Sequence, residues 1–483
     1  MSACTRVCLK ARPKILASYP SRPAATTASQ PRDYEAGAKP FKDIPGPGGI
    51  YRWPVIGTLL HFKPFTEFTP ETLNRLFESL HNTYGPIIKV RLPGPTVMTS
   101  NPRDFETVYR NEGRCPNRPV FDIEVVYAER NNEKGSINIA QGEEWLKLRT
   151  PINKRLLKAD SAHFYLEAQN SVADDFVRIL ARNDLDAEKM ADYFFRYAAE
   201  SIGIATFNTR LQLLNHRDGG EAEEFLHASK DHLRILQETL TVNMGGYKWF
   251  RNRIYRDFEK AMNILKKHAN KHTGRAKESI QTQLADGSLD PDHPNLLYSL
   301  LSDPSLTDED ITLITTVLYS AGTESTARNL QVLFHTLAMN PDIQERLRAE
   351  VLQTLGKDRP LTVKDLSTMS YLKACVKESF RLNYPIPSGV IRYLPSDVVL
   401  SGYKVPSGVP IILQNPRACM EYFDNPRQFL PERWLRTADR RKQENIVNMA
   451  LLPFSHGPRN CPGQRFALQE IYLAAVKVAN CQY

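Results

Sequence analysis

The feature that most constrains the fold is a long helical pattern between Thr307 and Pro341. Thr307 with Asp310 three residues later predicts a capping box, and Asp308 and Glu309 fall where a helix N-terminus favours acids. Pro341 predicts where the helix ends. Roughly thirty residues at 1.5 Å per residue give a helix of about 45 Å. Since the segment has no coiled-coil heptads, a helix of this length must cross a large domain.

The chain is 483 residues long, so it can bury a core of that size, and nothing in it indicates a second independent domain. Its content of hydrophobic (41%) and charged (24%) residues is that of a globular protein rather than a disordered one. The patterns predict a helix near 70–83, strands near 86–92 and 95–99, a mostly irregular and plausibly substrate-facing segment over 113–140, several helices over 143–272, a polar break near 284–296, and a helix over 371–383.

The N-terminal segment 1–32 contains six basic residues and no acid. The whole chain has a net charge of +9, so the remainder has only +3, and the argument for nucleic-acid binding loses most of its support. Because the segment is also rich in Ser, Thr and Ala, it predicts a cleaved mitochondrial presequence, with a disordered basic tail as the alternative. Residues 33–44 read as a linker. No stretch approaches the roughly 18 apolar residues of a membrane span.

The seven cysteines are odd in number and widely scattered, which indicates a reducing compartment rather than a disulfide framework. A zinc site is not indicated, because the sequence has no C-x-x-C pair and no closely spaced Cys/His cluster. A single cysteine taken alone reads as a small buried hydrophobic residue.

Cys461 lies in a Gly- and Pro-rich loop that runs from Phe454 to Gly463, with Arg459 two residues before it. A predicted helix over 464–478 follows at once. Backbone N–H groups of such a loop, together with a helix N-terminus, are expected to lower the thiol pKa and hold a thiolate. A thiolate bound to haem iron favours cleavage of an O–O bond.

Phe454, Arg459, Cys461 and Gly463 fall in the order F-x-x-G-x-R-x-C-x-G. This order resembles the haem-binding loop of the cytochrome P450 family, the haem-thiolate mono-oxygenases. The resemblance implies a mainly α fold with small β-sheets (α+β) and one large domain over 45–483. It also implies haem b between the long helix and the loop, with Cys461 as axial ligand of the iron. Relatives continue into a β-rich tail that this chain is expected to lack.

Ala321, Gly322, Glu324, Ser325 and Thr326 lie within the long helix. Small residues leave room for a planar cofactor, and an acid followed by hydroxyls can open the helix, admit water and relay protons. Alone, the segment also reads as a polar solvent face with a tolerated glycine. It resembles the family's A-G-x-[DE]-T-T oxygen-binding motif, with serine in the usual threonine position, so which hydroxyl delivers the proton stays open.

Three further residues are expected to be structural. Glu378 and Arg381 share a helix face at i, i+3, where an ordinary surface pair contributes little. They resemble the family's E-x-x-R motif. That resemblance implies a buried pair completed by Arg433 of the later P-E-R-W segment.

Trp145 and Arg149 share a helix face at i, i+4, which alone predicts a packing or cation–π pair. The pair resembles the family's W-x-x-x-R, which points at a haem propionate. Arg392 and Arg459 are further candidates, because partly buried carboxylates need cationic partners. With Phe454 of the cysteine loop, these residues complete the expected cofactor-binding set.

Lys373 and Lys377 read either as a solvated basic edge or, from a resemblance to the mitochondrial branch, as a docking site for an acidic ferredoxin. Arg465 could add to that site, although Gln464 stands where many relatives have a second arginine. The aromatic and basic segment 247–253 reads as helix packing or as a membrane contact.

The resemblance therefore implies a mitochondrial mono-oxygenase, peripheral on the matrix side of the inner membrane. It would hydroxylate a lipophilic, sterol-like or xenobiotic substrate with O₂, using electrons from NADPH delivered through a reductase and a ferredoxin. No residue identifies the substrate. Two alternatives stay open: a haem-thiolate isomerase or dehydratase that needs no external electrons, and a truncated, non-catalytic haem-binding protein.

Overall fold

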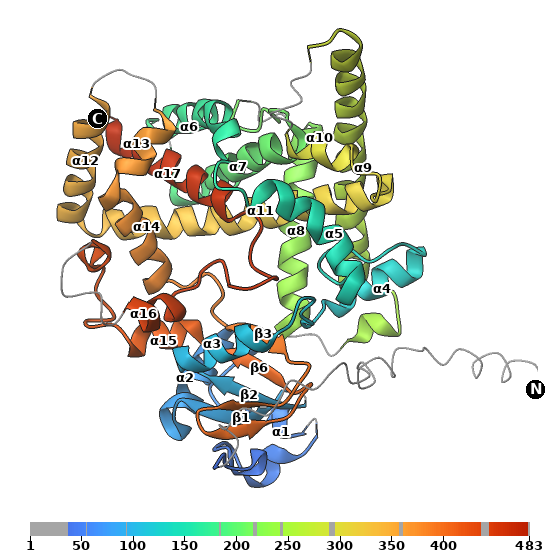
Figure 1. Cartoon of the computed structure of the whole chain (residues 1–483), viewed down its shortest axis with the longest axis vertical. Helices are drawn as coiled ribbons and strands as arrows, with labels where there is room; N and C mark the ends of the chain where they lie inside the picture. Colours follow the sequence, from blue (N-terminus) through green and yellow to red (C-terminus); the bar gives the residue numbers. More distant parts are fainter. Residues whose placement is uncertain are drawn as a thin grey trace, which may run out of the picture.

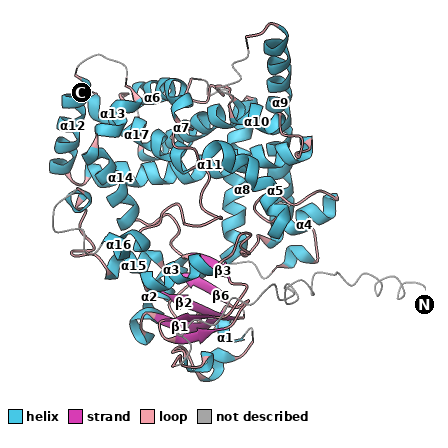
Figure 2. Cartoon of the chain, viewed as in Figure 1, coloured by secondary structure: helices cyan, strands magenta, loops and turns pink. Residues whose placement is uncertain are grey.

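The computed structural model describes most of the chain and shows a large helical body with strands at one end (Figures 1 and 2). The predicted presequence 1–32 lies outside the described residues, as does the start of the predicted linker. The described residues are 37–54, 56–92, 94–182, 185–215, 220–241, 245–288, 295–356, 361–435 and 444–481.

Helices form most of the structure. The α-helices are α1 Ile56–Leu59, α2 Leu73–Tyr84, α3 Pro102–Asn111, α4 Asp122–Asn131, α5 Gly142–Leu156, α6 Leu166–Leu180, α7 Ala187–Phe207, α8 Glu221–Thr241, α9 Arg253–Ala285, α10 Leu296–Leu301, α11 Asp308–Ala338, α12 Pro341–Leu355, α13 Val363–Thr368, α14 Ser370–Leu382, α15 Asn415–Glu421, α16 Glu444–Ala450 and α17 Gln464–Asn480. The short 3-10 helices are η3 Phe41–Asp43, η4 Gly49–Arg52, η5 Pro70–Thr72, η6 His163–Tyr165, η7 Gly246–Lys248 and η8 Pro431–Trp434.

The strands form two small sheets. The strands are β1 Ile87–Arg91, β2 Pro95–Thr99, β3 Val390–Tyr393, β4 Val398–Leu400, β5 Tyr403–Val405 and β6 Pro410–Leu413. One sheet has the order β1-β2-β6-β3, with β2 and β6 parallel and the other pairs antiparallel; the other sheet pairs β4 with β5. The N-terminal hairpin and a late part of the chain therefore share one sheet. This architecture confirms the predicted mainly α fold with small β-sheets.

Helix α11 crosses the middle of the molecule (Figure 1) and packs against α7, α8, α9, α14 and α17. Thr307 and Asp310 form the predicted capping box at its N-terminus. The expected opening within the helix does not occur, because α11 is continuous. The hydroxyls of Thr323 and Ser325 instead donate to carbonyl oxygens one turn earlier, at 2.8 and 2.7 Å, and leave the backbone ladder intact.

The prediction of a mostly irregular segment over 113–140 is wrong in part, because helix α4 lies within it. Ile123, Val126 and Tyr127 are buried in a core cluster that also includes α8 and α9. This burial stabilises a helix whose own sequence has little amphipathic character, and tertiary packing commonly overrides local preference in this way. Asn132 ends the helix in the left-handed conformation, with φ of 51°.

Candidate active site

The loop before α17 presents Cys461 at the turn into that helix. The N–H of Cys461 donates to the carbonyl oxygen of Phe454 at 2.8 Å, which closes the loop. The N–H groups of Gly463 and Gln464 hydrogen-bond to the sulfur. Gly457 has a φ of +77°, and a Cβ added there would lie 1.8 Å from Oε1 of Glu112. The loop therefore requires a glycine at this position for both conformation and space.

The surroundings of Cys461 act on its pKa in opposite directions. Burial raises the pKa of the thiol, whereas the two N–H donors and the charge of Arg149 lower it. Burial is the largest of these effects, so the pKa of the thiol is raised. The expected net lowering is therefore wrong for this structure, because the donors offset only part of the desolvation.

Arginines from four segments meet beside this loop. Arg149 from α5 donates to Oδ1 of Asn460 at 2.8 Å. Arg459 donates to the carbonyl oxygens of Pro116 and Ala140 at 2.9 and 3.0 Å, and its guanidinium lies 3.9 Å from the ring centre of Trp145. All three side chains of this stack are buried.

Arg392 from β3 completes the group together with a residue that the sequence analysis missed. Arg392 donates to Oε2 of Glu112 at 2.7 Å and to Oγ of Ser455 at 3.0 Å. The missed residue, Arg118, donates to the carbonyl oxygen of Asn138 at 3.2 Å. Neither Arg118 nor Glu112 belongs to a motif with a recognisable spacing, and only the fold brings them here.

The four guanidinium groups of Arg118, Arg149, Arg392 and Arg459 carry more positive charge than their neighbours neutralise. Burial, then repulsion from the other three, lowers the pKa of Arg459 to about 9. Burial also lowers the pKa of Arg149 to about 10, and Arg118 adds to that lowering. Among the described residues, Nη1 of Arg459 and Nε of Arg118 are buried with no hydrogen-bond partner. The cluster therefore has spare buried donors for an anionic ligand.

Helix α11 has one exposed face that carries small residues. Ala321 and Ser325 are exposed, although α11 is packed among five other helices. Thr326 is buried and lies on another face of the helix. Gly322 faces α7, where an added Cβ would come within 2.6 Å of the Ile202 side chain. Of the two hydroxyls left open by the sequence, Ser325 is the one on the exposed face.

Glu324 lies at the edge of that face and is itself only 4% exposed. Its Oε1 accepts a bond of 2.6 Å from Nε of Arg328 on the same helix. Its Oε2 is buried and has no hydrogen-bond partner among the described residues. Arg328 therefore fixes one oxygen of Glu324, and the other oxygen is available to interact with a further group.

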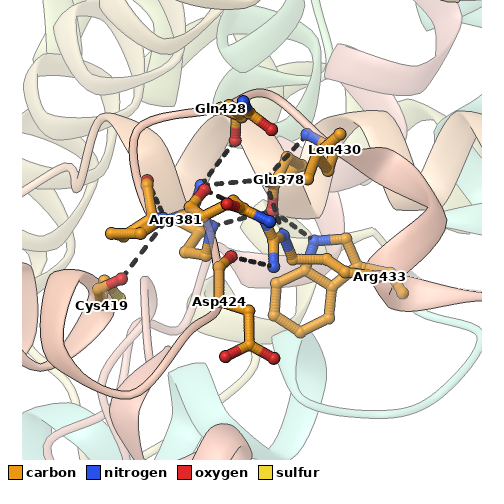
Figure 3. Close-up of polar contacts among 10 residues, drawn as sticks. Glu378, Arg381, Cys419, Asp424, Gln428, Leu430 and Arg433 are labelled. Atoms are coloured by element: carbon orange, nitrogen blue, oxygen red, sulfur yellow. Dashed lines mark hydrogen bonds and ion pairs between the residues drawn. The ribbon is translucent and has the colours of Figure 1, made fainter.

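Glu378, Arg381 and Arg433 come together at the start of η8 (Figure 3). Oε1 of Glu378 accepts from Arg381, Arg433 and the N–H of Leu430 at 2.9 to 3.0 Å. Oε2 of Glu378 accepts from Arg381 and from Nε1 of Trp434. The remaining donors of the two arginines reach carbonyl oxygens, namely those of Cys419, Asp424, Asn425, Pro426 and Gln428. The network ties α14 to η8 and the segment before it.

The three basic residues proposed for docking differ in their surroundings. Nζ of Lys373 donates to the carbonyl oxygen of Ser367 at 2.6 Å, and Nζ of Lys377 lies 4.2 Å from the ring centre of Trp434. Arg465 is exposed and donates to the carbonyl oxygen of Leu157 at 3.2 Å. Both lysines are half-buried.

The residues around Cys461 fit a haem. Spare arginine donors suit two propionate carboxylates, a sulfur with two N–H donors suits an iron-bound thiolate, and the exposed face of Ala321 and Ser325 leaves room on α11. Within the described residues, no group of three His, Cys, Asp or Glu side chains could hold a bare metal ion.

Comparisons with known proteins agree with this site. A family model for cytochrome P450 matches residues 47–478. The chain is 30% identical to "Probable cytochrome P450 12a5, mitochondrial" of Drosophila melanogaster, over 91% of this chain and 85% of the relative. It is 31% identical to "Probable cytochrome P450 12e1, mitochondrial" of the same species, over 89% and 84%. It is 27% identical to "Cholesterol side-chain cleavage enzyme, mitochondrial" of Mesocricetus auratus, over 91% and 83%.

These matches make the protein a haem-dependent mono-oxygenase by class. The chain belongs to the cytochrome P450 family, and relatives that it matches over most of its length are named as mitochondrial. Across the part of the chain that the structure describes, every helix is too short or too polar to cross a bilayer.

Proposed function

We propose that this protein is a mitochondrial mono-oxygenase that hydroxylates a lipophilic, sterol-like or xenobiotic substrate with O₂ and electrons from a ferredoxin. The supporting observation is the meeting of the Cys461 loop with an under-neutralised arginine cluster close to the core helix α11. The electrons would come from NADPH through a ferredoxin reductase. The presequence 1–32 and the mitochondrial names of the relatives support placement in that organelle.

In this proposal the arginine cluster and the cysteine loop hold the cofactor. Arg118, Arg149, Arg392 and Arg459 would bind the two propionates, with Trp145 packed against Arg459. Phe454, which packs against Phe380, belongs to the loop that would hold the cofactor. Cys461 would provide the sulfur ligand of the haem iron, and the N–H groups that follow it favour its thiolate form. Bound haem supplies oxygen activation. Glu378, Arg381 and Arg433 keep α14 and the η8 segment in place without touching the reacting atoms.

The proton-handling residues lie on α11. Glu324 holds a proton-accepting oxygen, Oε2, free of other bonds, while Arg328 fixes the other oxygen. Ser325 presents its hydroxyl on the exposed face and can accept a proton while donating its own. Because Thr326 is buried on another face, we assign hydroxyl delivery to Ser325 and a packing role to Thr326.

The expected docking site for ferredoxin is the basic surface of Lys373, Lys377 and Arg465. The ammonium groups of the two lysines contact Ser367 and Trp434, and Arg465 is exposed, so these cations suit transient, charge-steered contact with an acidic partner. A separate surface bears on membrane contact. Trp249 and Phe250 are 59% and 73% exposed. Together with Arg251 and Arg253 they support peripheral binding to the matrix side of the inner membrane.

The spectrum of the reduced, carbon-monoxide-bound protein tests the cofactor assignment. The wild type should show the red-shifted Soret band of thiolate ligation, and Cys461→Ala should lose it. The matched control is Cys481→Ala, a half-buried cysteine at the end of α17, which should keep the band. A wild type that binds no haem, or a Cys461→Ala variant with an unchanged band, would contradict the proposal.

Turnover with ferredoxin, reductase and NADPH tests the electron source. Lys373→Glu with Lys377→Glu should raise the KM for ferredoxin roughly tenfold or more without altering the carbon-monoxide spectrum. Lys404→Glu, an exposed lysine on β5, is the matched control. Product formation from a peroxide substrate without any external electrons would instead favour the isomerase or dehydratase alternative.

A further inference from the structure

A buried cluster that the proposed mechanism does not use joins helices α4, α8 and α11. His232 of α8 lies between Ser320 of α11 and Glu124 of α4. Its Nδ1 is 2.8 Å from Oγ of Ser320, and its Nε2 is 3.6 Å from Oε1 of Glu124. The three residues are 2%, 1% and 4% exposed, respectively. Ser136 and Asn138 also donate to Glu124, at 2.9 and 3.2 Å, so its carboxylate is held in place.

The cluster ends one helical turn before Glu324. Ser320 and Glu324 are related by i, i+4 on α11, so their Cβ atoms lie about 5–6 Å apart on neighbouring positions of one face. At 3.6 residues per turn, Glu324 is rotated about 40° from Ser320 toward the exposed face that carries Ala321 and Ser325. The unpartnered Oε2 of Glu324 is buried in this region. Glu324 therefore lies between the buried cluster and the open face.

We propose that Glu124, His232 and Ser320 form a buried proton relay that resupplies Glu324. This inference rests on the proposed function, in which Glu324 gives up protons. Protonated His232 donates its Nδ1 proton to Oγ of Ser320, and the hydroxyl proton of Ser320 passes to Oε2 of Glu324. One proton moves, no electron is transferred, and the neutral ring of His232 accepts another proton before the next cycle. Glu124 stabilises the charged imidazolium.

Two other interpretations fit the same residues less well. A nucleophilic Ser–His–Glu triad would need Ser320 open to a substrate, yet this side chain is 1% exposed. A purely structural pin between α8 and α11 would need only the hydrogen bond and not a titratable ring. That second interpretation is an outcome of the experiment below.

The variant His232→Gln separates a relay from a pin. A glutamine amide can still hydrogen-bond to Ser320, but it cannot carry a proton near neutral pH. With ferredoxin, reductase, NADPH and a turned-over lipophilic substrate, we expect product per NADPH to fall roughly tenfold, with released peroxide rising to match. We also expect a larger solvent deuterium isotope effect on product formation. Ser320→Ala should behave alike.

The matched control is His268→Gln. His268 is also buried and also paired with a glutamate, Glu224 at 2.9 Å, but it lies on α9 and its ring stacks on Phe225. Its substitution should leave product per NADPH unchanged. Wild-type coupling and isotope effect in His232→Gln would overturn the relay and leave a structural pin.

A second readout does not depend on turnover. In protein labelled with ¹⁵N-histidine, the His232 ring signals are those lost in His232→Gln. Glu324→Gln should shift these signals and leave the His268 signals in place, because only His232 is coupled to Glu324. Unshifted His232 signals would overturn the relay. A wild type that forms no product would instead count against the proposed function, while this spectrum would still test the coupling.

Discussion

In the described part of the chain, two groups of buried and half-buried arginines differ in how well their donors are satisfied. Around Glu378, the donors of Arg381 and Arg433 reach a carboxylate and carbonyl oxygens, and both oxygens of Glu378 are shared (Figure 3). Around Cys461, the arginine cluster retains buried donors without partners, and mutual repulsion helps to lower arginine pKa values. The comparison shows that a satisfied buried network marks scaffold, whereas an unsatisfied one marks a ligand site.

The largest expected effect is on the satisfied group. Glu378→Gln removes the charge that two buried arginines share, and uncompensated buried charge costs about 3–5 kcal/mol. We expect most of the variant to fail to fold or to unfold at much lower urea concentration. Glu106→Gln, which breaks an exposed pair with Arg110, is the control and should change little. Near-native stability of Glu378→Gln would break the comparison.

The unsatisfied group should respond mainly through its ligand. Arg459→Gln removes charge from a cluster that already repels itself, so we expect a small change in urea stability before haem binds. Haem binding loses charge-assisted bonds worth about 1.5–3 kcal/mol, which is roughly a 10- to 150-fold weaker affinity. The rate of haem transfer to an acceptor protein measures this loss, with the surface variant Arg417→Gln as control. Equal losses of urea stability and of haem affinity in Arg459→Gln would contradict the difference between the two arginine groups.

The buried carboxyl of Glu470 extends the comparison, and its expected effect on stability is smaller. Burial raises the pKa of Glu470 well above its usual 4.5, offset in part by a bond from Ser201, and its Oε1 has no partner among the described residues. The folded protein favours the protonated carboxyl of Glu470. The contribution of this carboxyl to the free energy of unfolding is therefore complete below about pH 4.5 and is lost as the pH rises toward the raised pKa.

We therefore expect Glu470→Gln to be more stable than the wild type by about 1 kcal/mol at neutral pH, and by less at pH 5. Urea unfolding at pH 5, 6.5 and 8 measures the trend. Glu421→Gln, on α15, is a control without this burial. A difference that is constant over this range, or that shrinks with rising pH, would contradict the assigned pKa direction.

Motif residues were predictable from sequence because their local spacing carries the information. Cys461, Glu378 and Arg381 lie in short patterns that resemble the family, and the capping box of α11 follows from two residues three apart. The strands near 86–92 and 95–99 were predicted from local alternation and turn residues, and β1 and β2 confirm them. These features depend on contacts close in the chain.

The remaining site could not be predicted, because it depends on burial set by distant segments. Arg118 and Glu112 enter the arginine cluster only when β3 and the cysteine loop pack beside them. Helix α4 was missed since its core partners lie in α8 and α9. The sign of the Cys461 pKa shift was wrong for the same reason, because the sequence shows donors near sulfur but not how deeply sulfur is buried.

The close approach of Gly322 to Ile202 limits how this enzyme can change its substrates. A side chain at position 322 would collide with the Ile202 side chain of α7, which would have to shift to admit it. Adaptation of the binding chamber, in nature or by directed evolution, must therefore proceed through residues such as Ala321, whose side chain points away from that contact. A library that varies position 321 should return more folded variants than one that varies position 322.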